Sequence, residues 1–202
     1  MNKKILAFTG CVAIASLSGC ALTTEQIAVS YNKQSAVSKI AGADNVSVNV
    51  QVTDQRSDKS KVSNKKNGYG MEMAPITASE DIAVTIRKAI EQELQSRGFS
   101  VGTDMAQVKI AADVTRFHND FKMGFFAGDA VADLNMSVMV KAKNGNQLYT
   151  KQIVAQGMEP NTQLATGNNA SIALGRALEN AMKILFEDQS FLSALVASSG
   201  AK

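Results

Sequence analysis

The chain has 202 residues, of which 45% are hydrophobic and 19% charged, and its formal net charge is +3. This length suits one ordinary domain and is short for two. Without Lys3 and Lys4 the 21 basic residues become 19, against 18 acidic residues, so most of the apparent basicity belongs to the N-terminus. A nucleic-acid partner needs a strong excess of basic residues on one face, and the composition therefore argues against one.

The first twenty residues have the layout of a processing signal. The two lysines precede an almost uncharged apolar stretch over 5–17, and two small residues then lead to Cys20. Basic, apolar and small segments in this order are typical of a secretory signal peptide, and the apolar run is too short for a spanning helix. The stretch Leu17-Ser18-Gly19-Cys20 resembles the lipobox of bacterial lipoproteins. The alternative is an ordinary signal peptide that leaves Cys20 as a free thiol.

The lipobox resemblance implies that residues 1–19 are a cleaved signal peptide and that Cys20 is lipidated on sulfur and acylated on nitrogen. Cys11 would be discarded with the signal peptide, which excludes disulfides, cysteine-metal sites and cysteine nucleophiles in the mature chain. Several acyl chains would form a permanent anchor. Ala21 follows the cysteine where aspartate would favour the inner membrane, so the resemblance implies the outer membrane, with the domain facing the periplasm.

Residues 20–44 are rich in Thr, Ser, Gln, Asn and Ala and show no sustained period. We expect a lipidated N-terminus and a flexible tether with a typical span of roughly 25–30 Å. A single periplasmic domain over 45–198 follows, and the tail after Ser198 is expected to fray.

The first half of this domain predicts one strand and one helix. Valines alternate with polar residues over 46–53, which indicates a half-buried strand. Residues 54–70 are polar and rich in lysine, which predicts a solvated loop. Ser79 is the expected N-cap of an amphipathic helix with acidic residues in its first turn, and Gly98 is expected to end it.

The second half predicts three strands and a last helical region. Strands are expected over 108–115 and 134–143, and Asn144-Gly145 predicts a type I′ hairpin to a third strand. In that register Val140 faces Tyr149 and Met136 faces Ile153. A weaker helical stripe covers 172–185, extended by apolar residues up to 195. The order strand, helix, strand, strand, strand, helix predicts an α+β two-layer sandwich, with a mostly antiparallel sheet of about four strands and two helices packed on one face.

Two short stretches add a family resemblance to this order. The valine strand runs into Thr53-Asp54-Gln55-Arg56, and the helix ends in Arg97-Gly98-Phe99-Ser100-Val101-Gly102. Together with the lipobox and the Asn144-Gly145 hairpin, they make nearly the whole chain resemble the YajG-type family of bacterial outer-membrane lipoproteins. The resemblance implies a location and a fold. The family is itself largely uncharacterised, so no substrate or catalytic residue follows from it.

A phenylalanine-rich stretch precedes the strand expected over 134–143 and is not expected as a mark of that family. Four of the eight phenylalanines, Phe117, Phe121, Phe125 and Phe126, lie within ten residues. Exposed aromatic clusters mark interaction surfaces, and the hypothesis is that Phe121, Phe125 and Phe126 contact a partner protein or dip into the membrane surface. The alternative is that the segment folds back and completes the core.

Other polar residues favour structural or solvated roles. The basic loop over 56–66 could contact anionic glycan or lipid phosphates, but Asp54 and Asp58 dilute its charge and favour a solvated loop. His118 is the only histidine and lacks the partners that metal binding or proton transfer needs. The chain shows no nucleophile elbow, phosphate loop, zinc-helix motif or paired carboxylates in a recognisable setting. We therefore expect no enzyme, no metal and no cofactor.

These observations favour a non-enzymatic binding or assembly module of an envelope complex, held at the outer membrane through Cys20. The partners expected are the membrane, through the N-terminal lipid, and an envelope protein. The alternative is a binder of small glycan or lipid ligands in a groove between sheet and helices. A hydrolase acting on the cell wall is a third and weaker candidate. The partner, the pathway and the oligomeric state do not follow from the sequence.

Overall fold

The structure, a computed structural model, describes residues 22–102, 105–124 and 127–197. Cys20, Phe125 and Phe126 lie outside the described residues. The elements in chain order are β1 (Glu25–Ile27), η1 (Ala43–Asn45), β2 (Ser47–Asp54), β3 (Ser63–Lys66), β4 (Glu72–Ala78), α3 (Ile82–Ser96), β5 (Ser100–Val101), β6 (Val108–Lys122), β7 (Gly128–Ala142), β8 (Gln147–Thr162), α4 (Gly167–Phe186) and α5 (Gln189–Ala197).

The α+β class is confirmed, but the arrangement differs from the one predicted. Strands form a five-stranded sheet in the order β5-β2-β6-β7-β8 and a three-stranded sheet in the order β1-β4-β3. Both sheets are mixed, because β2 runs parallel to β5 and β6 and β1 runs parallel to β4. The prediction of one sheet of about four strands with two helices is therefore wrong. Strands β1, β3 and β5 have only two to four residues, and β4, which contains Pro75, does not alternate apolar with polar residues, so no sequence pattern reveals these strands.

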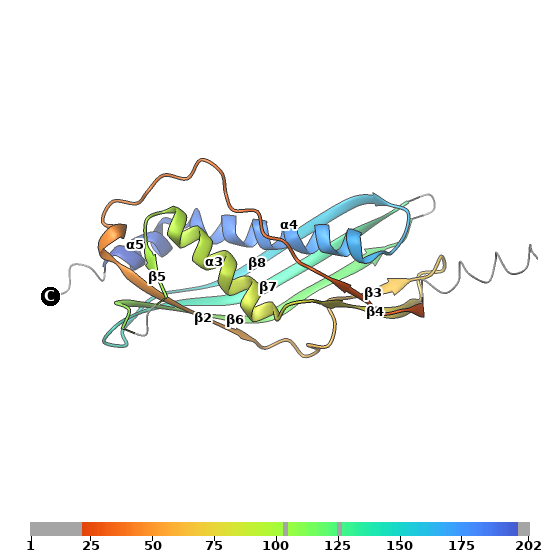
Figure 1. The fold of residues 1–202 in the computed structure, drawn as a ribbon, viewed down its shortest axis with the longest axis horizontal. Helices are drawn as coiled ribbons and strands as arrows, with labels where there is room; N and C mark the ends of the chain where they lie inside the picture. The colour runs from red at the N-terminus through yellow and green to blue at the C-terminus, as the bar shows by residue number, and fades with distance from the viewer. Residues whose placement is uncertain (1–21, 103–104, 125–126, 198–202) are drawn as a thin grey trace, which may run out of the picture.

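Helices cover one face of the five-stranded sheet. In Figure 1, α3, α4 and α5 lie on the same side of β2, β6, β7 and β8. Alternate residues of these strands point into that layer, and Ile110, Leu134 and Val138 are fully buried there. Each such side chain contributes roughly 1.5–3 kcal/mol relative to an exposed one. Within the described ranges no helix or strand packs over the opposite face of β6, β7 and β8 (Figure 1).

The β7–β8 hairpin has the predicted register but a different turn. Val140 pairs with Tyr149 and Met136 with Ile153, as expected. Of the two predicted turn residues only Gly145 has a positive φ, of 89°, so a type I′ turn is ruled out. The Gly145 N–H donates to the Ala142 carbonyl at 2.9 Å, and the register shifts between Val140 and Lys141. A type I turn followed by a left-handed glycine explains this shift, because its loop is longer than two residues.

Helix α3 begins two residues later than predicted and ends as predicted. Asp81, and not Ser79, is the N-cap, because its carboxylate accepts the backbone N–H groups of Ala83 and Val84. At the other end Gly98 has a φ of 97°. Its N–H donates to the Gln95 carbonyl, and the N–H of Phe99 donates to Leu94, both at 3.1 Å. This pair of bonds is the Schellman ending that a left-handed glycine permits.

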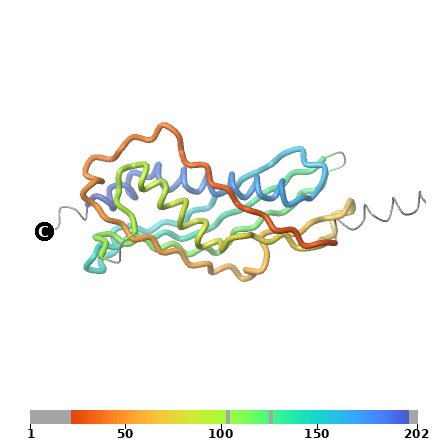
Figure 2. The backbone as a smooth tube through the Cα atoms, in the orientation of Figure 1, coloured from red at the N-terminus to blue at the C-terminus, as the bar shows by residue number. Residues whose placement is uncertain are grey.

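The segment predicted to be a flexible tether is docked onto the domain in its described part, residues 22–44. Strand β1 pairs with β4, and residues 28–42, which we call the strap, run along α3 and α4 (Figure 2). Ser171 donates to the Ala28 carbonyl at 2.6 Å, and Asn32 donates to Glu179 at 2.8 Å. Val29, Tyr31 and Ile40 of the strap also pack against the core. The tether prediction is wrong because these scattered apolar residues and the polar contacts fix the strap without a hydrophobic period.

The polar region 54–70 is likewise not all loop. Strand β3 pairs with β4, and its Ser63 and Asn64 are buried. Ser63 Oγ donates to the Asn119 carbonyl at 2.8 Å and accepts from Asn119 Nδ2 at 2.9 Å. These bonds fix β3 beside the second half of β6. The last helical region also divides, because Asp188 interrupts it and caps α5.

Candidate binding surface

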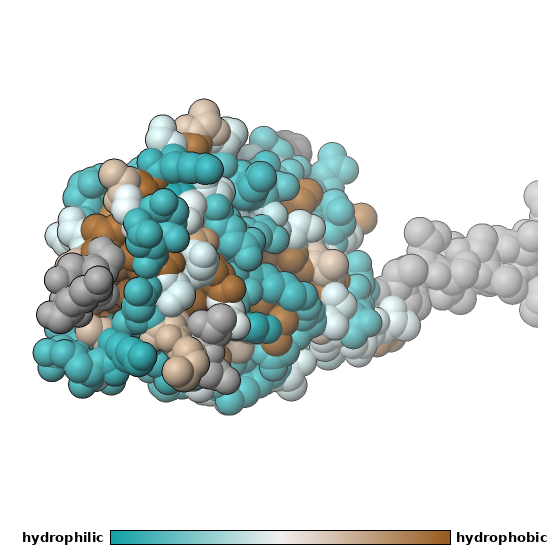
Figure 3. All heavy atoms as spheres, turned by 60° about the vertical axis from the view of Figure 1, so that its left-hand side comes forward, coloured by the Kyte–Doolittle hydropathy of each residue, from teal (hydrophilic) through white to brown (hydrophobic). Residues whose placement is uncertain are grey.

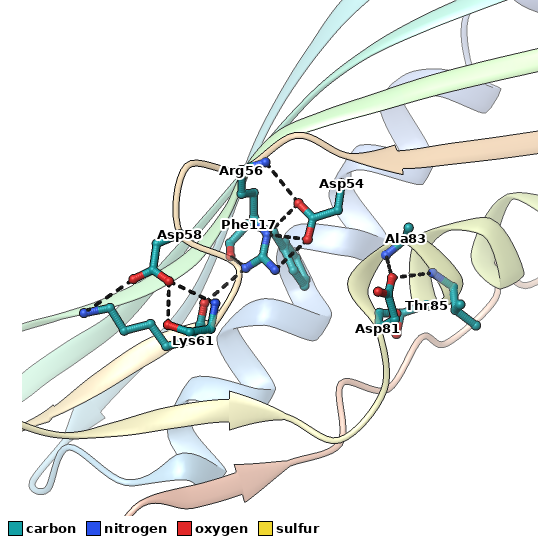
Figure 4. A network of polar contacts seen from close by, with 10 residues as sticks. Asp54, Arg56, Asp58, Lys61, Asp81, Ala83, Thr85 and Phe117 are labelled. Atoms are coloured by element: carbon teal, nitrogen blue, oxygen red, sulfur yellow. Dashed lines mark hydrogen bonds and ion pairs between the residues drawn. The ribbon is translucent and has the colours of Figure 1, made fainter.

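The Asp54-Gln55-Arg56 stretch forms a buried latch at the end of β2 (Figure 4). The Arg56 guanidinium makes a bidentate contact with Asp54, with Nε 3.0 Å from Oδ1 and Nη2 2.8 Å from Oδ2. Its Nη1 donates to the carbonyls of Lys61 at 3.1 Å and Phe117 at 3.3 Å. Burial opposes ionisation of Asp54, but the hydrogen bonds and charge of Arg56 outweigh it and keep the pKa of Asp54 below its ordinary value. The latch fastens the following loop to β6.

The Arg97-Gly98-Phe99 stretch holds the strap through a second buried network. Glu93 is completely buried and accepts hydrogen bonds from Arg97, from the Tyr31 hydroxyl and, at 2.9 Å, from the Gln34 backbone N–H. Arg97 Nη2 donates to Gln34 Oε1 at 2.9 Å, and the guanidinium lies 4.5 Å from the centre of the Phe186 ring. Burial and the Glu93 hydrogen bond raise the pKa of Tyr31. Both stretches that carry the family resemblance are thus structural.

The structure buries the described part of the phenylalanine cluster. Strand β6 continues to Lys122, and its alternation turns Phe117 and Phe121 into the core, with exposed fractions of 0% and 2%. The proposed docking role of Phe121 is therefore wrong, and the core alternative holds for it. Phe125 and Phe126 lie outside the described residues, and their role stays a prediction.

His118 lies on the face of the sheet that the helices leave uncovered, beside Arg116. Burial, followed by the positive charge of Arg116, lowers the pKa of His118, so the ring is neutral at pH 7. Across residues 22–102, 105–124 and 127–197, no group of three metal-ligating side chains comes together.

The uncovered face carries a basic cavity at the end of the sheet near the β7–β8 turn. Its volume is about 300 Å³, and it lies across β2, β6 and β7. Asn49 pairs with Lys109 and Lys109 pairs with Lys141, so these side chains form one row across three strands. The full lining is Asn49, Gln51, Met105, Ala106, Lys109, Lys141, Ala142, Lys143 and Gly145.

The polar groups of this cavity have no partners in the described part of the protein. Lys109, Lys141 and Lys143 form no ion pair there, and the buried Asn49 Oδ1 accepts no hydrogen bond. Like charges directly opposite on neighbouring strands destabilise a sheet, so the Lys109–Lys141 pair costs folding free energy. An anionic group between the two ammonium groups would remove that cost. The cavity therefore suits carboxylate or phosphate groups of a partner.

Part of the basic cavity could be predicted from the sequence. Lys109 and Lys141 occupy outward positions of β6 and β7, and Lys143 follows β7 in the turn. The alternation of one strand, however, does not tell which residues face it on the next strand. The parallel pairing of β2 with β6 and the antiparallel pairing of β6 with β7 create the row.

Comparisons with known proteins fit this architecture. A family model described as an uncharacterized lipoprotein matches residues 34–195. The chain belongs to this lipoprotein family. The lipoprotein YajG of Escherichia coli is 23% identical over 192 residues, which cover 94% of this chain and 95% of YajG. The predicted YajG-type resemblance is confirmed.

A solved structure shares the fold of this lipoprotein. The crystal structure of a Xanthomonas campestris protein aligns with a TM-score of 0.57 at 11% identity, covering 85% of this chain and 96% of that one. A minor lipoprotein of Acinetobacter baumannii aligns at a TM-score of 0.40 and 10% identity, over 69% of this chain and 87% of that chain, too weakly to support an argument. No helix in the described part of this lipoprotein is long and apolar enough to cross a membrane.

Proposed function

We propose that this lipoprotein is a non-enzymatic binding module of the bacterial envelope, anchored by lipid at Cys20 in the outer membrane and facing the periplasm. The observation that carries the binding role is the uncovered sheet face with its basic cavity. Helices cover only one side of the five-stranded sheet, and the other side presents three lysines without ion pairs among the described residues. The partner is an envelope protein with an acidic segment that fits between Lys109 and Lys141.

Electrostatics support this partner chemistry. Charged groups placed to complement a partner mainly steer encounter and give specificity, which suits a module that must find one component in a crowded compartment. Repulsion between the cross-strand lysines Lys109 and Lys141 destabilises the free protein. An acidic partner would remove this repulsion, so its removal would add to the free energy of binding.

The centre of the layer between sheet and helices does not support the alternative ligand groove. Side chains there, such as Ile110, Leu134 and Leu178, are completely buried, and such close packing leaves no room for a ligand. A smaller cavity of about 210 Å³ lies at the edge of this layer, between the 54–62 segment and the start of α3. Small-ligand binding in such a groove stays a prediction of the sequence.

In-cell photo-crosslinking tests the proposal. A crosslinking residue replaces Gln51, which lines the basic cavity, and a matched one replaces Lys183, which is exposed on α4. We expect one dominant protein adduct from position 51 and none from position 183. Lys141→Gln should reduce the adduct while leaving the melting temperature equal or higher, because it removes the like-charge pair. No protein adduct from position 51, or the same adduct from both positions, would overturn the proposal.

A further inference from the structure

The end of the molecule at which the chain enters β1 carries exposed hydrophobic side chains from four separate segments. Ten large hydrophobic residues are exposed in the described part of the chain, and five of them belong to this end. Tyr69 is 91% and Leu164 70% exposed. Figure 1 shows the start of β1, the β3–β4 turn, the end of β6 and the β8–α4 turn at the same end of the long axis. The five residues are Leu22, Tyr69, Met71, Met123 and Leu164.

Close contacts join these segments in two pairs at this end. A Cβ atom added to Gly70 would lie 3.8 Å from Met123 Cγ, so the β3–β4 turn lies against the β6–β7 turn. A Cβ atom added to Gly167 would overlap Glu25 Oε1, so the start of α4 lies against β1. The exposed hydrophobic residues therefore sit on packed turns and not on isolated loops.

Charges at this end suit a lipid surface. The carboxylate of Glu25 pairs with Lys65 at 3.1 Å, and that of Asp120 pairs with Lys66 at 2.6 Å. Lys122 is exposed and forms no ion pair with any described residue. Two further carboxylates lie here: Glu72 accepts a hydrogen bond from Asn64, and Asp129 faces Lys122 across β6 and β7. Positive and negative groups are therefore nearly balanced at this end, which limits repulsion from anionic lipid headgroups. Exposed tyrosine is also typical of membrane–water interfaces.

The length of chain ahead of β1 identifies the occupant. Because β1 pairs with β4, Glu25 is already part of the folded domain, and only the four residues 21–24 separate it from Cys20. The five residue steps from Cys20 to Glu25 span at most about 17 Å. With the lipidation of Cys20 that the proposed function assumes, this end is held close to the headgroups of the bilayer.

We infer that this end is a membrane-contact surface, called the membrane seat below. It orients the domain so that the long strands β6, β7 and β8 point away from the bilayer. Strand β7 rises from Gly128 at the membrane end to Lys141 in the basic cavity. Thirteen steps along a strand span roughly 43 Å. The seat therefore holds the cavity at the far side of the domain, where a partner can reach it. Figure 3 brings that far end forward, and hydrophobic residues there are scattered among hydrophilic ones.

Site-specific fluorescence on the full-length, acylated protein tests this inference. Cys11 and Cys20 are the only cysteines, so Tyr69→Cys, Met123→Cys and Leu164→Cys each provide one free thiol after processing. Asn144→Cys in the β7–β8 turn is the matched control at the opposite end. Each labelled protein is bound to vesicles of phosphatidylethanolamine and phosphatidylglycerol that carry a lipid-linked nitroxide quencher.

We expect the labels at 69, 123 and 164 to shift to shorter wavelength and to lose most of their emission, while the label at 144 keeps its emission. Flotation of the vesicles distinguishes failure of the lipid anchor at Cys20 from failure of the membrane-contact surface. Protein that floats with all four labels equally unquenched would overturn the membrane seat and leave the anchor intact. Protein that fails to float would overturn the anchor at Cys20 and the seat together.

Discussion

Glu93→Ala tests whether the buried network fixes the strap. The substitution leaves the Arg97 guanidinium, which is 5% exposed, without its carboxylate and removes the acceptor of Tyr31 and of the Gln34 N–H. Breaking a buried ion pair by removing one partner costs roughly 3–5 kcal/mol. In a chain of this size each kcal/mol lowers the melting temperature by about 2–4 °C, so we expect a drop of roughly 6–20 °C.

Urea unfolding and calorimetry measure this loss, and the same helix provides the control. Glu91 pairs with Arg87 on the surface of α3 at 3.5 Å, and such exposed pairs contribute less than about 1 kcal/mol. Glu91→Ala should therefore change little. Trypsin should also cut after Lys33 in the strap faster in Glu93→Ala than in either the wild type or the control. Equal melting temperatures for the two variants would refute the reasoning.

Three further changes test the latch, the helix end and the last turn. Arg56→Lys keeps the positive charge but loses the bidentate contact with Asp54, and it should lower the free energy of unfolding by roughly 1–3 kcal/mol. Urea unfolding measures this change, and an unchanged unfolding midpoint would contradict the role of the latch. Gly98→Ala, at a φ of 97°, should cost roughly 1–2 kcal/mol in the same assay, whereas Gly68→Ala, in open space, should not; equal losses would contradict the Schellman ending. Hydrogen bonds from Lys151 and Tyr149 lower the pKa of Asp188 to about 2. The ionised carboxylate therefore contributes fully to the free energy of unfolding above its ordinary pKa of 3.8, and this contribution is lost as the pH falls toward 2. Asp188→Asn should flatten the acid unfolding curve in that window, and an unaltered curve would count against this role.

The sequence predicted the elements that have a strong period. The strand over 46–53, the end of α3 at Gly98 and the Val140–Tyr149 register follow from alternation, a left-handed glycine and a hairpin turn. These signals depend on residues close together in the sequence. They predict the structure correctly where the local preference is consistent with the packing of the core.

The parts that the sequence missed depend on contacts between distant residues. The strap looked like a tether because its anchor is the buried Glu93, about sixty residues further along the chain. Strand β3 looked like a loop because its residues are polar and its buried Ser63 is satisfied by Asn119, 56 residues away along the chain. The basic cavity arises only when β6 pairs with β7, and Phe121 is buried because β6 is longer than its predicted strand.

The lipid anchor at Cys20 is the central claim, because both the location and the membrane seat depend on it. Fractionation of cells that produce the wild type and Cys20→Ala, with mass spectrometry of the mature N-terminal peptide, tests it most directly. The account predicts that the wild type fractionates with the outer membrane, begins at an acylated Cys20 and is absent from the soluble fraction, whereas Cys20→Ala is not membrane-bound. An unmodified Cys20, or a Cys20→Ala protein that stays with the membrane, would contradict it.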